Sequence, residues 1–138
     1  MVEFYVVFEK DNAAIQGGDY LDLMLFSRAP FTQLLTEAGF QDVSDHVGFT
    51  PEMNAIVNES LPANLQEEWS EEMSNWTGPE TAMAMWAVLR AAVETQPELF
   101  NEWPGMLQEV NETLDTAERV FQRAVDRGAR WFIPSPGF

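Results

Sequence analysis

The chain has 138 residues, of which 23 are Asp or Glu and seven are Lys or Arg, so its formal net charge is −16. This length suits one domain spanning residues 1–138, and the absence of cysteine excludes disulfides, thiolate nucleophiles and cysteine metal sites. The negative charge disfavours binding to nucleic acid and to anionic membranes, and it favours a basic protein surface as partner.

The negative charge is confined to the middle of the chain. Residues 37–118 hold seventeen acids and a single cation, Arg90, whereas the two flanks together hold six acids and six cations. Adaptation to high salt is one explanation of the acidity, but it would acidify solvent-exposed faces throughout the chain. The balanced flanks therefore favour one acidic surface, with salt adaptation as the alternative.

Neither a signal peptide nor a membrane span is expected. Residues 1–10 lack the basic and apolar regions of a signal peptide. The longest uncharged run, residues 81–89, is far too short to cross a bilayer. We therefore expect a cytoplasmic protein.

The N-terminal part of the chain predicts a strand followed by an ambiguous segment. Residues 2–9 are rich in β-branched and aromatic side chains, which predicts a strand that ends at Lys10. Gly17 and Gly18 then indicate a loop. Residues 20–26 fit either a strand or a helix, and their Leu and Met content favours a helix.

Two short helices are predicted next, each beginning at a proline. Pro30 opens the first helix, and Gly39 suits the left-handed position just beyond its end. Thr50 caps the second helix, which starts at Pro51. The apolar residues that this second helix is expected to turn inward are Met53, Ile56 and Val57.

A further amphipathic helix is predicted across residues 65–76, because apolar residues recur there at intervals of four, four and three. These residues are Leu65, Trp69, Met73 and Trp76. The densest acidic cluster of the chain would lie on the opposite face, and it consists of Glu67, Glu68, Glu71 and Glu72. We interpret this cluster as a candidate surface for a basic partner. A solvated helix face and a weak Ca²⁺ or Mg²⁺ site are the alternatives.

A buried central helix is predicted after this segment. Thr77 and Glu80 fit a capping box, in which the threonine side chain caps the helix. Residues 81–89 carry no charge, so the helix that begins here should be buried on more than one face. Gln96 and Pro97 end it.

The last helix has the clearest pattern. Between Met106 and Arg127 apolar residues recur three and four positions apart, and Gly128 suits the left-handed stop. The same stripe would suit a homodimer, although the core of the domain can use it equally well. The apolar triplet at residues 131–133 then predicts a short strand beside the N-terminal strand.

Four tryptophans fall in the middle of the chain, and clustered aromatic residues commonly line small-ligand sites. They are Trp69, Trp76, Trp86 and Trp103. A pocket lined by them, with carboxylates as general acid or base, would indicate a small-molecule-binding or enzymatic domain. A role in the core is the alternative reading. No phosphate-binding loop, nucleophile motif or zinc motif occurs, so we assign no catalytic residue, cofactor or metal site.

The remaining candidates are a histidine and a row of arginines. His46 follows Ser44 and Asp45, but three consecutive side chains cannot form a nucleophile–base–orienter triad, so we interpret it as an ordinary loop residue. The arginines at and beyond the end of the last helix are Arg119, Arg123, Arg127 and Arg130. They would suit an anion, and pairing with acids of the same chain is the alternative.

Together these patterns predict an α+β fold: a mostly helical single domain with a small sheet, formed by the N-terminal strand and the short C-terminal strand and packed against a layer of helices. For function, we expect a small acidic, non-catalytic interaction protein, such as an inhibitor or immunity-type protein, that docks its acidic helical face on a basic partner. The alternative is a small-molecule-binding or carboxylate-dependent enzyme domain. A monomer and a homodimer are both compatible with the sequence.

Overall fold

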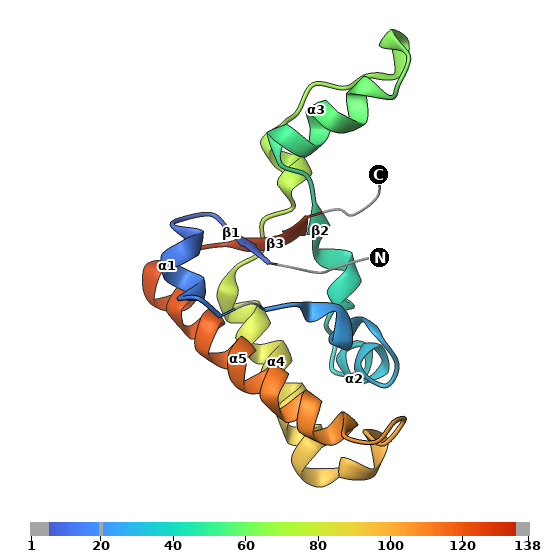
Figure 1. Cartoon of the computed structure of the whole chain (residues 1–138), viewed down its shortest axis with the longest axis vertical. Coiled ribbons are helices and arrows are strands. Elements are labelled where there is room, and N and C mark those ends of the chain that lie inside the picture. The colour runs from blue at the N-terminus through green and yellow to red at the C-terminus, as the bar shows by residue number, and fades with distance from the viewer. Residues whose placement is uncertain (1–5, 20, 135–138) are drawn as a thin grey trace.

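The computed structural model describes residues 6–19 and 21–134, which form an α+β fold in which helices predominate (Figure 1). In chain order the helices and strands are β1 (Val7–Phe8), α1 (Asn12–Gln16), α2 (Phe31–Glu37), β2 (Val47–Gly48), α3 (Pro51–Glu59), α4 (Pro79–Thr95), α5 (Met106–Arg127) and β3 (Trp131–Pro134). Short 3₁₀ turns lie at Leu23–Ser27, Val43–His46, Ala63–Leu65, Glu71–Ser74 and Pro97–Leu99. The predicted fold class is confirmed.

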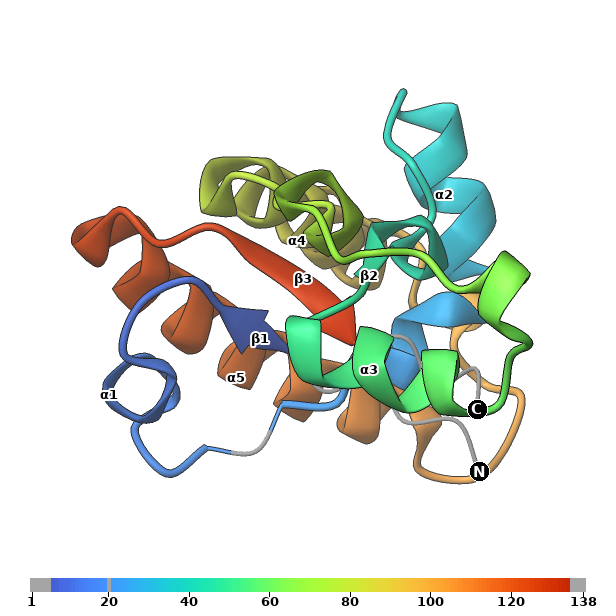
Figure 2. The ribbon, with the colours of Figure 1, turned by 90° about the horizontal axis from the view of Figure 1, so that it is seen from above.

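In the described part of the chain, β3 is the central strand of a three-stranded sheet (Figure 2). β1 pairs with it in antiparallel fashion, with Val7 opposite Phe132, and β2 pairs with it in parallel, with Val47 opposite Ile133. The predicted pairing of the two ends of the chain is confirmed, whereas residues 2–5 of the predicted first strand lie outside the described residues. β2 escapes prediction because two residues are too few to show alternation.

The core lies between this sheet and the paired helices α4 and α5, and Phe121 of α5 is at its centre. The ring of Phe121 contacts those of Phe8, Trp86 and Trp131, with centroids 5.3, 5.5 and 5.1 Å apart. The bounds predicted for the last helix are confirmed, and Gly128 ends it with a left-handed φ of 63°. Its apolar stripe is buried in the chain's own core and includes Val110, Leu114, Ala117, Phe121 and Ala124.

Two predictions for α4 are wrong. The helix is buried on one face only, and its exposed residues include Ala84, Ala87 and Ala91. Residues 81–89 are uncharged partly because several of them are alanines. Alanine is small and favours a helix, so it can remain exposed to solvent. The residue at the cap is Gly78, with no side-chain hydrogen bond, rather than Thr77. Thr77 instead pairs with β3, because its backbone N–H and C=O both bond to Trp131 at 2.9 Å.

The segment at residues 20–26, for which a helix was favoured over a strand, forms the 3₁₀ turn Leu23–Ser27 in its described part. Asp22 starts this turn by accepting a hydrogen bond from the backbone N–H of Met24 at 2.9 Å. A carboxylate bonded to a backbone N–H two residues ahead favours a tight turn over a longer helix, and this local contact decides the conformation.

The two short proline-initiated helices are confirmed. Pro30 directly precedes α2, and Gly39 beyond its end has a φ of 88°. Thr50 caps α3 by accepting a hydrogen bond from the backbone N–H of Met53 at 3.1 Å. Among the described residues, none of these helices or the longer ones has the length and apolar character that crossing a membrane requires.

Candidate functional site

Residues 49–76 form an arm that projects from the body of the molecule (Figure 1). The chain runs outward along α3, turns at Ala63–Leu65 and comes back through a return segment, residues 66–76. None of residues 49–73 is buried. The outer part of the arm, residues 49–73, therefore contributes no fully buried side chain to the core.

The helix predicted across residues 65–76 is wrong, because most of the return segment has no regular structure. Side chains of α3 hold it by its backbone. Nδ2 atoms of Asn54 and Asn58 donate to the carbonyl of Glu67 at 2.9 and 2.8 Å, and the N–H of Glu67 donates to Oδ1 of Asn58 at 3.2 Å. A helix would instead stack like charges four residues apart, at a cost of roughly 0.2–0.5 kcal/mol per pair.

The arm carries a concentrated negative charge. All four acids of the predicted partner-binding cluster are exposed on the return segment: Glu67, Glu68, Glu71 and Glu72. Glu52 and Glu59 of α3 bring the arm to six carboxylates, and no Lys or Arg occurs between Arg28 and Arg90. Glu71 approaches Arg130 of the body at 3.6 Å. Within the described ranges, no three of these side chains gather closely enough to hold a metal ion.

The arm also exposes large apolar side chains. Ile56 is 51% exposed and Leu65 is 57% exposed. The prediction that Ile56 turns inward is wrong, and its neighbours Met53 and Val57 are only half-buried. α3 contains no buried residue although its sequence has helical periodicity. Periodicity predicts an apolar face but does not say whether another element covers it.

The arm joins the body at a neck, which we define as residues 45–49 and 73–77. The two sides of the neck lie side by side, because the backbone N–H of Phe49 donates to the carbonyl of Met73 at 2.8 Å. Nδ2 of Asn75 also crosses the neck and donates to two backbone carbonyls of the opposite side, both at 3.2 Å. These hydrogen bonds tie the base of the arm to β2.

His46 is buried inside the neck and is only 4% exposed, so it is not the ordinary loop residue that we predicted. Its ring packs on Trp131 with centroids 4.9 Å apart, and its Nδ1 lies 3.3 Å from Oγ1 of Thr77. Its Nε2 is buried and has no hydrogen-bond partner among the described residues. Burial lowers the pKa of His46 below its ordinary value of 6.5, and the charges of Asp45 and Asp42 offset this only in part.

The four tryptophans of the predicted pocket do not lie together. Trp86 is fully buried in the core. Trp76 packs edge-on against Phe132 with centroids 4.7 Å apart, and Nε1 of Trp69 donates to a backbone carbonyl of the neck at 3.0 Å. Trp103 borders a cleft elsewhere. Closeness in the sequence is no guide here, since Trp69 and Trp76 belong to the arm and its base, whereas Trp86 lies inside the core.

The cleft beside Trp103 has a volume of about 400 Å³ and is lined by residues of the 3₁₀ turn Leu23–Ser27 and of α5. The guanidinium of Arg28 lies 4.9 Å over the ring of Trp103, and Nε1 of Trp103 donates to Glu109 at 3.2 Å. Glu112 also lines the cleft. This arrangement places one cation against an aromatic face, with carboxylates beside it.

Two of the predicted anion-binding arginines pair with the N-terminal part of the chain. Nη1 of Arg123 donates to the carbonyls of Ile15 and Gln16 at 3.1 and 2.9 Å. The same atom lies 3.3 Å from Asp19, and Arg119 lies 3.6 Å from that carboxylate. Both guanidinium groups are therefore engaged within the chain.

Arg130 also pairs within the chain, with Glu9 and with Glu71 of the arm. The hydrogen bond from Arg130 lowers the pKa of Glu9 below its ordinary value, and Glu9 in turn raises the pKa of Arg130. The side chain of Arg127 is exposed, and its backbone carbonyl accepts a hydrogen bond from Nζ of Lys10 at 3.3 Å. Three of the four arginines thus follow the intramolecular alternative.

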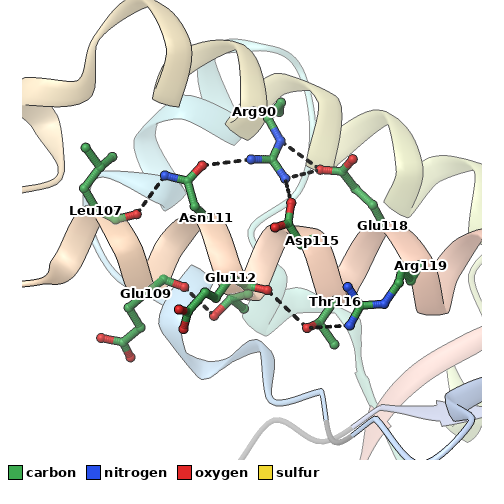
Figure 3. Close-up of polar contacts among 10 residues, drawn as sticks. Arg90, Leu107, Glu109, Asn111, Glu112, Asp115, Thr116, Glu118 and Arg119 are labelled. Carbon is green, nitrogen blue, oxygen red and sulfur yellow. Dashed lines mark hydrogen bonds and ion pairs between the residues drawn. The ribbon is translucent and has the colours of Figure 1, made fainter.

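Arg90 is a structural residue whose role the sequence patterns do not reveal. Figure 3 shows it reaching from α4 to α5, where it donates to Glu118 at 2.9 Å, to Asp115 at 2.7 Å and to Asn111 at 2.9 Å. Burial opposes the charge of Arg90, but the bonds with Glu118 and Asp115 outweigh it and keep the pKa of Arg90 above its ordinary value. The sequence shows only that Arg90 is the single cation between residues 37 and 118, and this does not say which acids it contacts.

No model of a known protein family matches this chain, and neither does any of the characterised proteins or solved structures compared with it. The features that can support a functional proposal are therefore those of the molecule itself: the acidic arm, the neck at its base and the cleft beside Trp103.

Proposed function

We propose that the protein is a non-catalytic cytoplasmic interaction protein that docks its acidic arm on a basic surface of another protein. An inhibitor or immunity-type protein that covers the cationic groove of a nuclease would have this chemistry. One observation carries the proposal: six carboxylates, no cation and two exposed apolar side chains, Ile56 and Leu65, occur together on one projecting arm.

Burial of the exposed apolar side chains would favour binding of the arm to a partner. Ordering a residue of the backbone costs roughly 1–2 kcal/mol, and residues 49–73 bury no side chain fully in return. Protein interfaces commonly place a few apolar anchors in a pocket and surround them with a polar rim. A partner that covers Ile56 and Leu65 would supply the missing burial, and the exposed carboxylates of the same arm would contribute to the rim.

The charge of the arm indicates the chemistry of that partner. The carboxylates repel anionic surfaces and attract cationic ones. Arg119 and Arg123 pair with Asp19 in the body, so they do not form a competing basic patch. A negative field of this kind steers the encounter with a basic surface, so association should be fast at low salt and slow down steeply as salt is added.

Site-specific photo-crosslinking in the host cell identifies the partner. A photoreactive amino acid replaces Leu65 on the arm or, as the matched control, the exposed Leu99 of the 3₁₀ turn Pro97–Leu99, outside the arm. We expect the probe at position 65 to capture a basic protein that the probe at position 99 does not capture. Identical products from both positions, or an acidic protein captured through position 65, would contradict the proposal.

Removing charge from the arm is expected to slow association with the captured partner by about tenfold at low salt, because steering depends on the local field. The arm variant carries Glu67→Gln, Glu68→Gln and Glu72→Gln; Glu71 stays because it pairs with Arg130. The control changes the net charge equally through Glu94→Gln, Glu98→Gln and Glu102→Gln. Stopped-flow kinetics at low and high salt measure the association rates of both variants. Equal slowing by the two variants would show that net charge, and not the arm, guides association.

A second candidate function is the binding of a small organic cation in the cleft beside Trp103. It corresponds to the small-molecule-binding domain that the sequence allowed as an alternative. The cation of Arg28 already lies on the face of Trp103 beside Glu109. A ligand with an ammonium group and an aliphatic chain would find carboxylates of α5 and apolar side chains such as Leu25 in the lining of the cleft.

Calorimetry with spermidine as the probe tests this second function. Changing Glu109 and Glu112 to Gln should weaken binding by about fivefold or more, which corresponds to a loss of roughly 1 kcal/mol. The control variant changes Glu68 and Glu72 of the arm. If both variants weaken spermidine binding equally, the amine is attracted by overall charge and the cleft is not its site.

A further inference from the structure

We propose that His46 is a latch at the neck, and that its protonation at mildly acidic pH releases the arm from the body. The latch follows from the geometry of the neck in the free protein. Its consequence, that a docked partner would be released as the pH falls, rests on the proposed function of the arm.

His46 is placed where the arm leaves the body. It is the last residue of the 3₁₀ turn Val43–His46, and β2 and α3 follow directly. Its ring packs on Trp131 of β3, and its Nδ1 contacts Oγ1 of Thr77, the residue at which the returning chain joins β3. One buried ring on the outgoing chain therefore contacts both the returning chain and the central strand of the sheet.

The closed neck favours the neutral ring over the protonated one. A neutral imidazole needs one donor and one acceptor, whereas the protonated ring has two N–H donors. Nε2 is buried without a partner among the described residues, so a proton there would be a buried, unsatisfied donor on a charged group. Oδ1 of Asp42, at the start of the same turn, is also buried and has no hydrogen-bond partner in the part of the chain that the structure describes.

The charged groups around the ring do not remove this penalty. Asp45 and Asp42 favour the protonated ring, but burial outweighs them and the pKa of His46 is lowered from 6.5. The contacts from the other elements, Thr77 on the returning chain and Trp131 on β3, are uncharged. The open neck, in which the ring is hydrated, therefore binds a proton more readily than the closed neck does.

The sign of the pH dependence follows from this difference. Well above pH 6.5 the ring is neutral in both states, and the neck keeps its full stability. As the pH falls below 6.5 the open state takes up a proton first, so the closed state is lost progressively until its own, lower pKa is passed. The equilibrium for opening should rise by about tenfold for each unit by which the pKa of His46 lies below its ordinary value.

Nuclear magnetic resonance on the free protein tests the latch. His46 is the only histidine of the chain, so its ring signals titrate without ambiguity. We expect a midpoint below 6.5, and we expect the amide of Phe49, which bonds to Met73 across the neck, to lose protection from hydrogen exchange as the pH falls from 7.5 to 5. The amide of Leu114 in the buried helix α5 is the internal control and should keep its protection.

Two variants separate the latch from a general effect of acid. His46→Phe keeps an aromatic ring on Trp131 but cannot be protonated, and His46→Gln keeps a polar group beside Thr77. In both, the loss of protection at Phe49 should no longer depend on pH. A titration midpoint at or above 6.5, or an unchanged pH dependence in both variants, would overturn the latch. Because no partner is present, either result leaves the proposed docking of the arm to its own experiments.

Discussion

Replacing Gly48 with alanine is expected to lower the free energy of unfolding by about 3 kcal/mol. An added Cβ would lie 2.0 Å from the carbonyl oxygen of Ser74 and 3.0 Å from Cδ2 of Phe132. The closest atom belongs to the backbone, so no rotation of a side chain relieves the clash. The two sides of the neck have to separate, which strains the hydrogen bond from Phe49 to Met73.

Urea denaturation followed by tryptophan fluorescence measures this loss. Gly78→Ala is the matched control, because Gly78 has an ordinary φ of −66° and its added Cβ would meet only the flexible carboxylate of Glu80, at 3.2 Å. The control should cost less than about 1 kcal/mol. Equal denaturation midpoints for the two variants would show that the chain does not need the close approach at position 48.

Replacing Phe121 with alanine is expected to cost about 3–5 kcal/mol of folding free energy, the largest effect of any single substitution proposed for this chain. Phe121 has no exposed surface, and its ring contacts Phe8 of β1, Trp86 of α4 and Trp131 of β3. Truncation therefore leaves a cavity at the point where the sheet and the two long helices meet. The melting temperature should fall by about 10 °C or more.

Thermal unfolding followed by circular dichroism measures the effect of Phe121→Ala. Phe121→Leu fills most of the cavity and should recover about half of the loss. Ile56→Ala and Leu65→Ala truncate exposed apolar side chains of the arm and should each cost less than about 1 kcal/mol. Similar losses for Phe121→Ala and for the arm variants would refute the division of the molecule into a packed core and an arm that the core does not need.

The contrast between these two groups of apolar residues bears directly on the proposed function. If Ile56 and Leu65 contribute little to folding, their exposure on an acidic arm has to be explained by something outside the chain. The arm variants then serve in the binding experiments as folded proteins. A change in partner affinity can be assigned to the interface and not to unfolding.

The sequence was sufficient to predict helices and strands wherever residues close together in the chain decide the structure. α5 could be bounded from Met106 to Arg127 because its apolar spacing repeats over many turns and Gly128 supplies the left-handed stop. Thr50 and Pro51 marked the start of α3 through a cap that involves only the first turn. The strand at β3 followed from a short apolar run bounded by polar residues and proline.

The predictions from sequence were wrong where contacts between residues far apart in the chain decide the structure. The return segment has helical spacing, yet Asn54 and Asn58 bind its backbone at Glu67, and residues 66–70 form no helix. Thr77 matches a capping box, but its pairing with Trp131 takes it away from the helix. In both cases a tertiary hydrogen bond overrides a local preference that is worth about 1 kcal/mol or less.

The sequence by itself determined that the chain folds as α+β, that its acids lie in the middle and that the last helix packs through one apolar stripe. These properties depend on composition and on spacings within a few residues. Only the tertiary structure decided that the acids at residues 67–72 lie on a projecting arm, that Arg90 links α4 to α5, and that His46 is buried at the neck. Each depends on contacts between residues far apart in the chain, and no local pattern records them.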